Sequence, residues 1–270
     1  MTRRLLLVWL LVIAPAACNT HKTPPAAHAA TKPGTVLVTG ANRGLGLEFA
    51  RQYAEAGWNV IATARDPESA AELRALAADN LRVTVEKLDV TEQASIDALA
   101  AKYAGKPIDV LINNAGVLGD VHAQTLGSLD RAEFARVMDV NVYGALAVAA
   151  AFRDQVAASE QKKIVSITSR SGTISQPGYR GPYFYRASKI ALNMVMRVLA
   201  DDLHERGVIV ALVAPYPTDT DMLRTLIGTE AASHQSRADD SVAGMIRVID
   251  GLTLDNSATP VLADGRPLAW

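Results

Sequence analysis

Along residues 35–263, short apolar runs alternate with longer segments of mixed polarity. The short runs are typical of buried strands, which we expect over residues 35–39, 60–63, 82–88, 110–112, 164–168, 208–214 and 260–263. In the longer segments, apolar residues recur every three or four positions. This spacing predicts helices over residues 45–56, 68–78, 91–103, 131–158, 185–206 and 241–251.

The alternation of strands and helices predicts the α/β class. Such alternation implies parallel strands joined by right-handed helical crossovers. We therefore expect a Rossmann-like, doubly wound parallel sheet in a single domain over residues 35–270. The chain of 270 residues, 49% of them hydrophobic, is large enough to bury the core of such a domain. Ligands of these sheets bind beyond the carboxyl ends of the strands, so candidate site residues are sought there.

The N-terminal segment differs in composition from the rest of the chain. Residues 1–18 combine a basic start, an apolar run and a small-residue site, which are the three parts of an export signal peptide. The apolar run over residues 5–14 is too short to cross a bilayer as a helix. This segment ends in Pro15-Ala16-Ala17-Cys18, which resembles a bacterial lipoprotein cleavage box with Pro15 where Leu is usual. Residues 19–34 are mostly Ala, Pro, Thr, His and Lys, a composition typical of a flexible tether.

Several interpretations of this segment are open. Cys18 could be lipidated, it could belong to a simple signal peptide, or the segment could result from a misplaced start codon. Thr2-Arg3-Arg4 also resembles a twin-arginine signal, the type that carries folded proteins. We expect export to the periplasmic side, with membrane contact only through an anchor at Cys18. If the segment is not a working signal, the protein is cytoplasmic.

The charge balance argues against nucleic-acid binding. The chain has 27 basic and 28 acidic side chains, and it lacks a dense block of Lys and Arg. Cys18 is the only cysteine, which excludes an intramolecular disulfide and a cysteine-rich zinc site. The histidines, including His204, show no pattern for a metal or a hydrolytic triad, so no metal site is predicted.

A glycine-rich segment joins the first predicted strand to the first predicted helix. Gly40, Gly44 and Gly46 follow a Gly-x-x-x-Gly-x-Gly spacing. Gly40 lets the chain turn off the strand, Gly44 lets the backbone approach a pyrophosphate, and Gly46 lets the helix lie close to the sheet. The helix N-terminus then faces the phosphates. The predicted dinucleotide site also includes Asn42, Arg43 and Leu45.

The end of the second predicted strand favours NADP over NAD. An NAD enzyme usually has a carboxylate there that accepts from the ribose 2′-hydroxyl, whereas this chain has Arg65. Arg65 and Arg43 can instead bind the 2′-phosphate of NADP. Asp66 weakens this contrast, and both arginines could be solvated loop residues. NADP(H) is the predicted cofactor.

Two further strand ends fit the same cofactor. Asp89, followed by Val90, ends the third strand, where its carboxylate can accept from the adenine amino group. Asn114, Ala115 and Gly116 follow the fourth strand, where small residues and an amide suit a loop close to the adenosine. Either junction alone is ordinary, but their order along the chain supports the dinucleotide site.

The candidate catalytic residues lie on and around the helix predicted at residues 185–206. Tyr185 and Lys189 are four residues apart and therefore share one helix face. A nearby ammonium lowers the pKa of a phenol, which is otherwise about 10 and too high for acid-base catalysis. Lys189 can also bind the nicotinamide ribose. Ser169, at the end of the preceding strand, could hold a substrate carbonyl beside Tyr185. Asn141 offers an amide that could order a water leading protons to Lys189, or it is a polar residue of a partly buried helix.

These motifs resemble the short-chain dehydrogenase/reductase family over residues 34–270. The resemblance implies a sheet of about seven strands, direct hydride transfer between nicotinamide C4 and the carbonyl carbon, and a tetrad of Asn141, Ser169, Tyr185 and Lys189. The long helices resemble those that build dimer interfaces, which implies a homodimer or tetramer. The segments around Ser169 and Tyr185, and the ending from Asp264 to Trp270, are similar to the C-factor and sniffer-like carbonyl reductases. That subgroup implies NADPH and reduction.

The segment after the sixth predicted strand departs from the family pattern. Pro215, Thr218 and Thr220 occupy cofactor-binding positions, but Tyr216 replaces a glycine that usually lies against the nicotinamide. The Tyr216 ring could crowd or close the pocket. Residues 220–236 are predicted to form a mobile substrate loop. Its candidate pocket-lining residues are Met222, Leu223 and Leu226.

The sequence thus predicts an NADPH-dependent oxidoreductase that reduces a small-molecule carbonyl, with Tyr185 as the general acid. The alternative is a non-catalytic NADP(H)-binding protein with a sensing or signalling role. Tyr216 and export away from the NADPH supply favour that alternative. Arg170 and Arg186, beside the tetrad, could attract an anionic substrate or could be surface residues.

Overall fold

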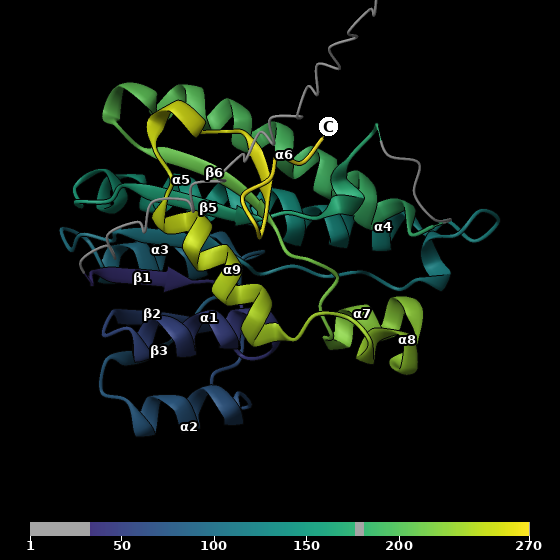
Figure 1. Ribbon diagram of the computed structural model, residues 1–270, viewed down its shortest axis with the longest axis horizontal. Coiled ribbons are helices and arrows are strands. Elements are labelled where there is room, and N and C mark those ends of the chain that lie inside the picture. Colours follow the sequence, from purple (N-terminus) through teal and green to yellow (C-terminus); the bar gives the residue numbers. More distant parts are fainter. Residues whose placement is uncertain (1–32, 176–180, 270) are drawn as a thin grey trace, which may run out of the picture.

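The fold is a seven-stranded sheet in which every pair of neighbouring strands is parallel. The computed structural model describes residues 33–175 and 181–269 (Figure 1). The strand order is β3-β2-β1-β4-β5-β6-β7, which confirms the predicted doubly wound, Rossmann-like sheet. The strands are β1 (Thr35–Val38), β2 (Asn59–Ala64), β3 (Val83–Lys87), β4 (Val110–Asn113), β5 (Lys163–Ile167), β6 (Ile209–Ala214) and β7 (Pro260–Leu262).

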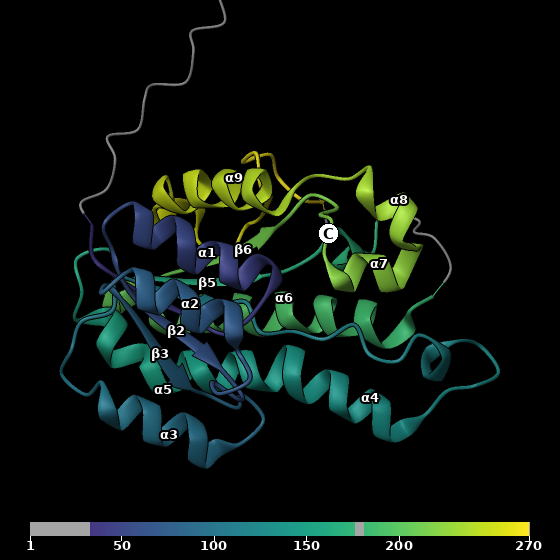
Figure 2. The same cartoon turned by 90° about the horizontal axis from the view of Figure 1, so that it is seen from below.

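Helices cover both faces of the sheet. In Figure 2, α1, α2 and α9 lie on one face, and α3, α4, α5 and α6 lie on the other. The helices are α1 (Gly44–Glu55), α2 (Ala71–Asp79), α3 (Gln93–Lys102), α4 (Arg131–Met138), α5 (Ala145–Ala157), α6 (Tyr183–Leu203), α7 (Asp221–Ile227), α8 (Thr229–Ser233) and α9 (Ala238–Asp250). Short 3-10 turns are η1 (His122–Gln124), η3 (Arg170–Gly172), η4 (His204–Arg206) and η5 (Leu254–Asn256), and a π-helical segment is η2 (Asp139–Gly144).

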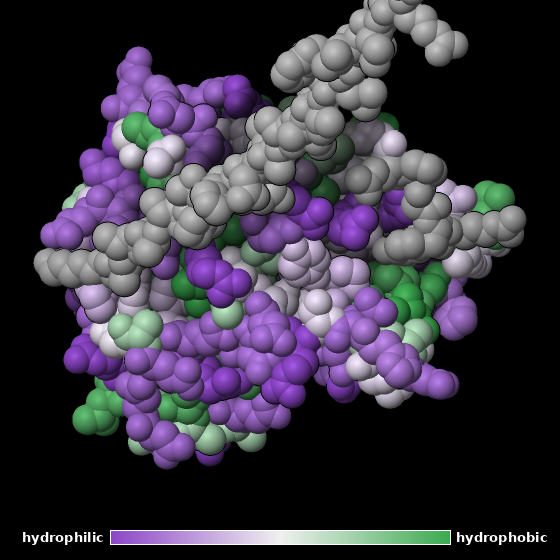
Figure 3. Space-filling view, viewed as in Figure 1, coloured by the Kyte–Doolittle hydropathy of each residue, from purple (hydrophilic) through white to green (hydrophobic). Residues whose placement is uncertain are grey.

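The strands bury side chains on both faces, so two hydrophobic clusters form. Val36 and Val38 of β1 pack with α1 and α9, whereas Leu37 between them packs with α3, α5 and α6. This division follows from the two-residue period of a strand. Phe49 and Phe152 are fully buried anchors of the two clusters, and burial of such side chains contributes about 1.5–3 kcal/mol each. The face of the molecule shown in Figure 3 is mostly hydrophilic, with hydrophobic residues in separate places.

The helix predicted over residues 131–158 is continuous in direction but irregular in its middle. It consists of α4, the π-helical segment η2 and α5. At this point the helix lies close to the loop after β3. Gly144 permits the contact, because a Cβ there would lie 2.8 Å from the carbonyl oxygen of Val90. Within the described residues, Arg131–Ala157 is the one helix long and apolar enough to cross a membrane. Its apolar character is explained by packing on the sheet through residues such as Phe152.

The prediction of a loop over residues 220–236 is corrected by the structure, in which most of this segment is helical. It folds into α7 and α8, which are separated by Gly228 at a φ of 88°. Thr220 starts α7 as its N-cap, and its Oγ1 accepts from the Leu223 amide at 3.4 Å. Four other helices begin two to three residues away from their predicted starts: α2, α3, α6 and α9 begin at Ala71, Gln93, Tyr183 and Ala238.

The predicted signal peptide, residues 1–18, lies outside the described residues, as does nearly all of the predicted tether. Gly34, the last predicted tether residue, belongs to the fold. Its carbonyl oxygen accepts from the Asn59 amide at 2.9 Å, which extends the pairing of β1 with β2 by one residue.

Candidate active site

A cavity of about 820 Å³ lies beyond the carboxyl ends of the strands. Its walls come from the loops that follow β1 to β6. The loops after β1 and β4 lie at its centre, where the order of the strands in the sheet reverses. This is the position at which doubly wound sheets bind ligands. Every predicted cofactor and catalytic residue except Asn141 lines it: Gly40, Asn42, Arg43, Gly44, Leu45, Gly46, Arg65, Asp89, Val90, Asn114, Ala115, Gly116, Ser169, Tyr185, Lys189, Pro215, Thr218 and Thr220. Met222, Leu223 and Leu226 also line it.

The glycine-rich loop brings α1 close to the sheet and leaves its N-terminus facing the cavity. Gly40 has a φ of 64°, a left-handed conformation that favours glycine. A Cβ on Gly46 would lie 2.2 Å from the carbonyl oxygen of Gly40, so any larger residue would push α1 away. The N-cap residue Arg43 provides no side-chain acceptor for the first turn. The start of α1 therefore suits a phosphate group.

The Asn114 side chain holds the loops after β1 and β4 together. Its Nδ2 donates to the carbonyl oxygens of Thr39 and Gly40 at 2.9 and 3.0 Å. In return, Thr39 Oγ1 accepts from the amides of Asn114 and Ala115 at 3.0 and 2.9 Å. The amide hydrogens of Asn114 are thus committed to the protein, and its role is to fix the gap between two cofactor-facing loops. The sequence analysis did not predict this role of Thr39, although Thr39 directly precedes Gly40 of the glycine-rich loop.

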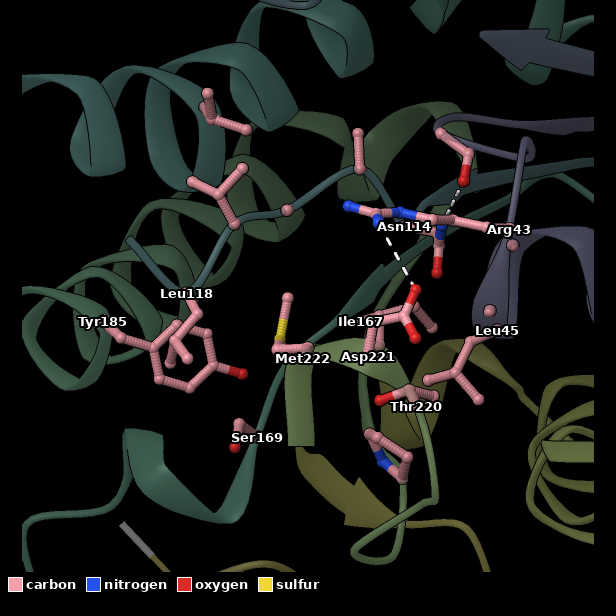
Figure 4. Close-up of a pocket in the computed structure, with 18 of the residues that line it drawn as sticks. Arg43, Leu45, Asn114, Leu118, Ile167, Ser169, Tyr185, Thr220, Asp221 and Met222 are labelled. Carbon is pink, nitrogen blue, oxygen red and sulfur yellow. Dashed lines mark hydrogen bonds and ion pairs between the residues drawn. The ribbon is translucent and has the colours of Figure 1, made fainter. Parts of the chain in front are cut away.

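Charged side chains lie at the adenosine end expected for the cofactor. Arg43 is 72% exposed and forms an ion pair with Asp221 of α7, at 3.4 Å between Nη1 and Oδ2 (Figure 4). Arg65 follows β2 and is exposed at the same cavity. Asp89 is partly used, because its Oδ1 accepts from the backbone amide and the hydroxyl of Thr91 at 3.0 and 2.7 Å.

Lys189 is a buried ammonium at the opposite end of the cavity. Its Nζ donates to the carbonyl oxygen of Ile167, at the end of β5, at 2.9 Å. Burial lowers the pKa of Lys189 to about 8, because the charged form loses its hydration. Nζ lies 5.7 Å from the centroid of the Tyr185 ring. The i, i+4 spacing on α6 thus brings the ammonium and the phenol together, as the sequence predicts.

Ser169 lies on the same side of the cavity as Tyr185. Its Oγ accepts from the Ser171 amide at 3.1 Å, and this bond directs the lone pair inward at the start of η3. The hydroxyl hydrogen of Ser169 can therefore donate to a ligand. In Figure 4, Met222 faces Tyr185 and Ser169 from α7, with Leu118 beside the Tyr185 ring. The reacting end of the cavity thus combines two hydroxyl groups with apolar walls.

The side chain of Asn141 is committed to contacts within the protein. Its Nδ2 donates to the carbonyl oxygen of Val117 and to Ser188 Oγ, both at 2.9 Å. Its Oδ1 accepts from the Val117 amide at 2.8 Å. Both hydrogens of this amide are occupied, so only the remaining lone pair of Oδ1 is left to order the predicted water. Asn141 also ties the loop after β4 to α6, in which Ser188 Oγ donates to the Tyr185 carbonyl oxygen at 2.7 Å.

Tyr216 does not need the conformational freedom of the glycine it replaces. Among described non-glycine residues, only Lys162 and Ala258 have positive φ. Tyr216 is half-buried against the cluster between the sheet, α1 and α9. Its side chain also lies close to Asp264 and Arg266 of the C-terminal segment. The ring is therefore held by the protein body at the wall of the cavity, which Tyr216 lines. It does not close the cavity, and the prediction that it crowds the substrate stays a prediction.

Comparison with known proteins identifies the family. The model of the short chain dehydrogenase family matches residues 34–231. The chain belongs to the short chain dehydrogenase family. It is 38% identical to C-signal of Myxococcus xanthus over 173 residues, which cover 64% of this chain and 99% of that protein. It is 34% identical to 1-hydroxy-2-glutathionyl-2-methyl-3-butene dehydrogenase of Rhodococcus sp. (strain AD45) over 239 residues, 87% of this chain and 99% of that enzyme.

Solved structures agree with this assignment. The NADPH-bound carbonyl reductase from chicken fatty liver has a TM-score of 0.80 and 32% identity, with 88% of this chain and all of that chain covered. The carbonyl reductase Sniffer of D. melanogaster has a TM-score of 0.77 and 25% identity, with 88% of this chain and 99% of that chain covered. The short chain dehydrogenase described here is thus an NADP-dependent oxidoreductase.

The residues of the cavity fit NADP(H). The volume of about 820 Å³ lies within the range of small-molecule and cofactor sites. Gly40 and Gly46 leave a space beside the start of α1 that side chains would fill, which suits the pyrophosphate. Arg43 and Arg65 line the cavity and would provide positive charge for the 2′-phosphate, and Lys189 would lie at the nicotinamide end.

Proposed function

We propose that this enzyme reduces the carbonyl group of a small molecule to an alcohol, with NADPH as the reductant and Tyr185 as the general acid. One observation carries the proposal. The Tyr185 phenol, the buried Lys189 ammonium and the Ser169 hydroxyl surround one end of a cavity whose other end has the glycine-rich loop. This arrangement supports proton donation and carbonyl binding at the point where the nicotinamide ring would end.

The proposed roles follow from the contacts of each side chain. Ser169 donates a hydrogen bond to the substrate carbonyl, because its own oxygen already accepts from Ser171. Tyr185 donates a proton to the same oxygen, and the ammonium of Lys189 stabilises the phenolate that forms. When bound, the reduced nicotinamide supplies a hydride to the carbonyl carbon. The walls near Leu118 and Met222 exclude water from this end of the site.

The experiment compares two tyrosines of the same helix turn. Tyr185→Phe should lower kcat by about 10²–10⁴-fold, because general acid catalysis contributes about that factor. The dissociation constant of NADPH should change less than about threefold, because a phenol hydroxyl contributes little to cofactor affinity beyond one hydrogen bond. Tyr183→Phe is the control, since Tyr183 is 51% exposed and does not line the cavity. Turnover that survives Tyr185→Phe would exclude Tyr185 as the acid.

A non-catalytic NADP(H)-binding role is less well supported. Of its two arguments, obstruction of the pocket by Tyr216 is weakened, because the ring lines the cavity without closing it. The other argument, export away from the NADPH supply, depends on the N-terminal segment. NADPH oxidation by the purified protein across a panel of ketones and aldehydes separates the two functions. Binding of NADPH without any carbonyl-dependent oxidation would favour the sensing role.

We also propose that the protein is exported and that Cys18 carries the anchor. This proposal depends only on the composition of residues 1–18. Membrane fractionation and the mass of the mature N-terminus test it. A full-length chain in the soluble cytoplasmic fraction would contradict it.

Sedimentation of the purified enzyme tests the homodimer or tetramer that the family resemblance implies.

A further inference from the structure

The N-terminus of α6, which carries Tyr185, is capped by a residue far away in the sequence. The N-cap residue is Pro182, and its side chain accepts no hydrogen bond. The backbone amides of Phe184 and Tyr185 donate instead to Gln124 Oε1, at 3.0 and 3.1 Å. Gln124 lies 60 and 61 positions before these residues, in the turn η1. A single side-chain oxygen thus satisfies two of the amides that a helix leaves unpaired at its start.

The other end of the Gln124 amide is equally committed. Its Nε2 donates to the carbonyl oxygens of Leu118 and Asp120, at 2.9 and 3.1 Å. Gln124 is fully buried, so no water competes for these bonds. The amide makes all four hydrogen bonds expected of it, which fixes its orientation. Leu118 belongs to the cavity wall beside Tyr185, so one buried side chain joins that wall to the catalytic helix.

The loop around Gln124 is shaped to hold it. Gly119 has a φ of 84°, and a Cβ there would lie 2.8 Å from Gln124 Nε2 and 2.7 Å from Val137 Cγ2. The next residue is anchored as well, because the Asp120 amide donates to Glu133 Oε1 of α4 at 2.6 Å. Gln124 therefore occupies a rigid place between α4 and α6 rather than a flexible loop position.

We propose that Gln124 is a positioning residue for the reaction: it fixes the first turn of α6 and thereby sets the Tyr185 phenol against Lys189 and the substrate carbonyl. The inference rests on the proposed function, in which Tyr185 is the acid. Lys189 is held separately, by the carbonyl oxygen of Ile167 at the end of β5. Loss of the Gln124 amide therefore loosens Tyr185 and leaves the ammonium in place, so the two groups lose their mutual geometry.

The test replaces Gln124 by methionine, which is similar in size and lacks the amide. Gln155→Met is the matched control, because Gln155 is also a buried glutamine, whose Nε2 donates to the Ala100 carbonyl oxygen far from the cavity. In Gln124→Met, kcat should fall about tenfold or more, since a misplacement of about 1 Å costs about 10²-fold. NADPH affinity should stay within about twofold in both variants, because neither glutamine lines the cavity or hydrogen bonds with the glycine-rich loop.

A second readout separates positioning from a general loss of stability. In the direction of alcohol oxidation the phenolate of Tyr185 is the active form, so activity rises with pH through its pKa. A phenol displaced from Lys189 loses stabilisation of its phenolate. The midpoint of this profile should therefore move up by about half a pH unit or more in Gln124→Met, and stay in place in Gln155→Met.

Hydrogen exchange on the unaltered enzyme gives an answer even if Gln124→Met does not fold. The amides of Phe184 and Tyr185 should exchange slowly, although first-turn amides of helices normally exchange fast. Fast exchange of both, or equal kcat and pH midpoints in the two methionine variants, would overturn the role of Gln124 alone. Turnover retained by Tyr185→Phe would overturn the proposed function and this inference together.

Discussion

Arg43 and Asp221 meet across the mouth of the cavity, with 3.4 Å between the guanidinium and the carboxylate (Figure 4). The pair joins the glycine-rich loop to the first turn of α7. Thr220, next to Asp221, also approaches this loop, because a Cβ on Gly44 would lie 3.9 Å from its methyl carbon. Arg43, which we expect to bind the 2′-phosphate of NADPH, is therefore engaged with α7.

Removal of this ion pair should strengthen NADPH binding. Asp221→Asn frees Arg43, and exposed ion pairs contribute about 0.2–1 kcal/mol, so the dissociation constant should fall by about 1.5- to 5-fold. The dissociation constant of NADH, which has no 2′-phosphate, should change less. Fluorescence titration measures both. Asp219→Asn is the control, because Asp219 pairs with Arg224 at 2.7 Å and does not line the cavity. Weaker NADPH binding in Asp221→Asn would show that Asp221 orients Arg43 productively.

Arg65 should distinguish the two nicotinamide cofactors. Loss of a charge-assisted contact to a phosphate costs about 1.5–3 kcal/mol, so Arg65→Ala should weaken NADPH binding about 10- to 100-fold. NADH binding should change by less than about twofold, because no phosphate faces the residue. Arg74→Ala, at an exposed arginine of α2 that pairs with Glu68, provides the control. An equal loss for both cofactors would place Arg65 elsewhere on the nucleotide.

The reduction rate should fall as pH rises through about 8. Burial lowers the pKa of Lys189 to about 8, so its ammonium is present below this pH and lost above it. Without the ammonium, the pKa of the Tyr185 phenol rises and the phenol becomes a weaker acid. The two groups interact and titrate as a pair, so the profile gives apparent values of the pair. Measurement of kcat at saturating NADPH across about pH 6 to 10 checks this, and a rate that rises above pH 8 would contradict it.

Burial of Lys189 also predicts that stability rises with pH, whereas the reduction rate falls with pH. The pKa of Lys189 is about 8 in the fold and 10.5 when unperturbed, so the unfolded chain binds more protons between these values. The free energy of unfolding of the cofactor-free enzyme should therefore rise with pH in this window, and the penalty is complete below about pH 8.

Lys189→Met removes the buried charge and should raise the free energy of unfolding at pH 7 by about 1–3 kcal/mol while it abolishes turnover. Loss of the bond to the Ile167 carbonyl oxygen offsets part of this gain. Urea denaturation of both proteins at pH 7 and at pH 10 measures the effect. A less stable variant at pH 7 would mean that the hydrogen bond outweighs the desolvation of the ammonium.

Tyr216 should matter more for stability than for turnover. Tyr216→Gly restores the usual family residue but removes a half-buried ring and its contacts with Asp264 and Arg266. We expect a loss of about 1–3 kcal/mol in the free energy of unfolding, with kcat changed less than about threefold. Tyr216→Phe, which keeps the ring, should lose less stability. A large gain of turnover in Tyr216→Gly would show that the ring obstructs the substrate.

The sequence predicts the features that depend on residues close together in the chain. Gly40, Gly44 and Gly46 span seven positions, and Tyr185 and Lys189 share one helix turn, so their arrangement follows from local geometry. The parallel sheet follows from the alternation of strands and helices. The cofactor residues then converge, because the carboxyl ends of parallel strands lie at one edge.

The features that the sequence missed depend on distant contacts. Gln124 caps α6 from about 60 residues away, and nothing in the pattern around it marks that partner. Thr39 and Asn114 are 75 positions apart, and their mutual hydrogen bonds appear only when β1 and β4 are neighbours. The helices α7 and α8 were missed because each is short and buries little apolar surface of its own.

The π-helical segment η2 determines the rotational phase of two halves of one long helix. Each residue of an α-helix advances the side chains by about 100°, so the extra residue in a π turn rotates everything after it by about that angle. Within this segment, Asn141 hydrogen bonds with Val117 and with Ser188 of α6, and beyond it Phe152 packs in the cluster between the sheet and α5. Removal of a single residue from this segment would keep both halves helical. It would nevertheless rotate either the anchor of the active-site loop or the hydrophobic face of α5 by about 100° away from its present partners.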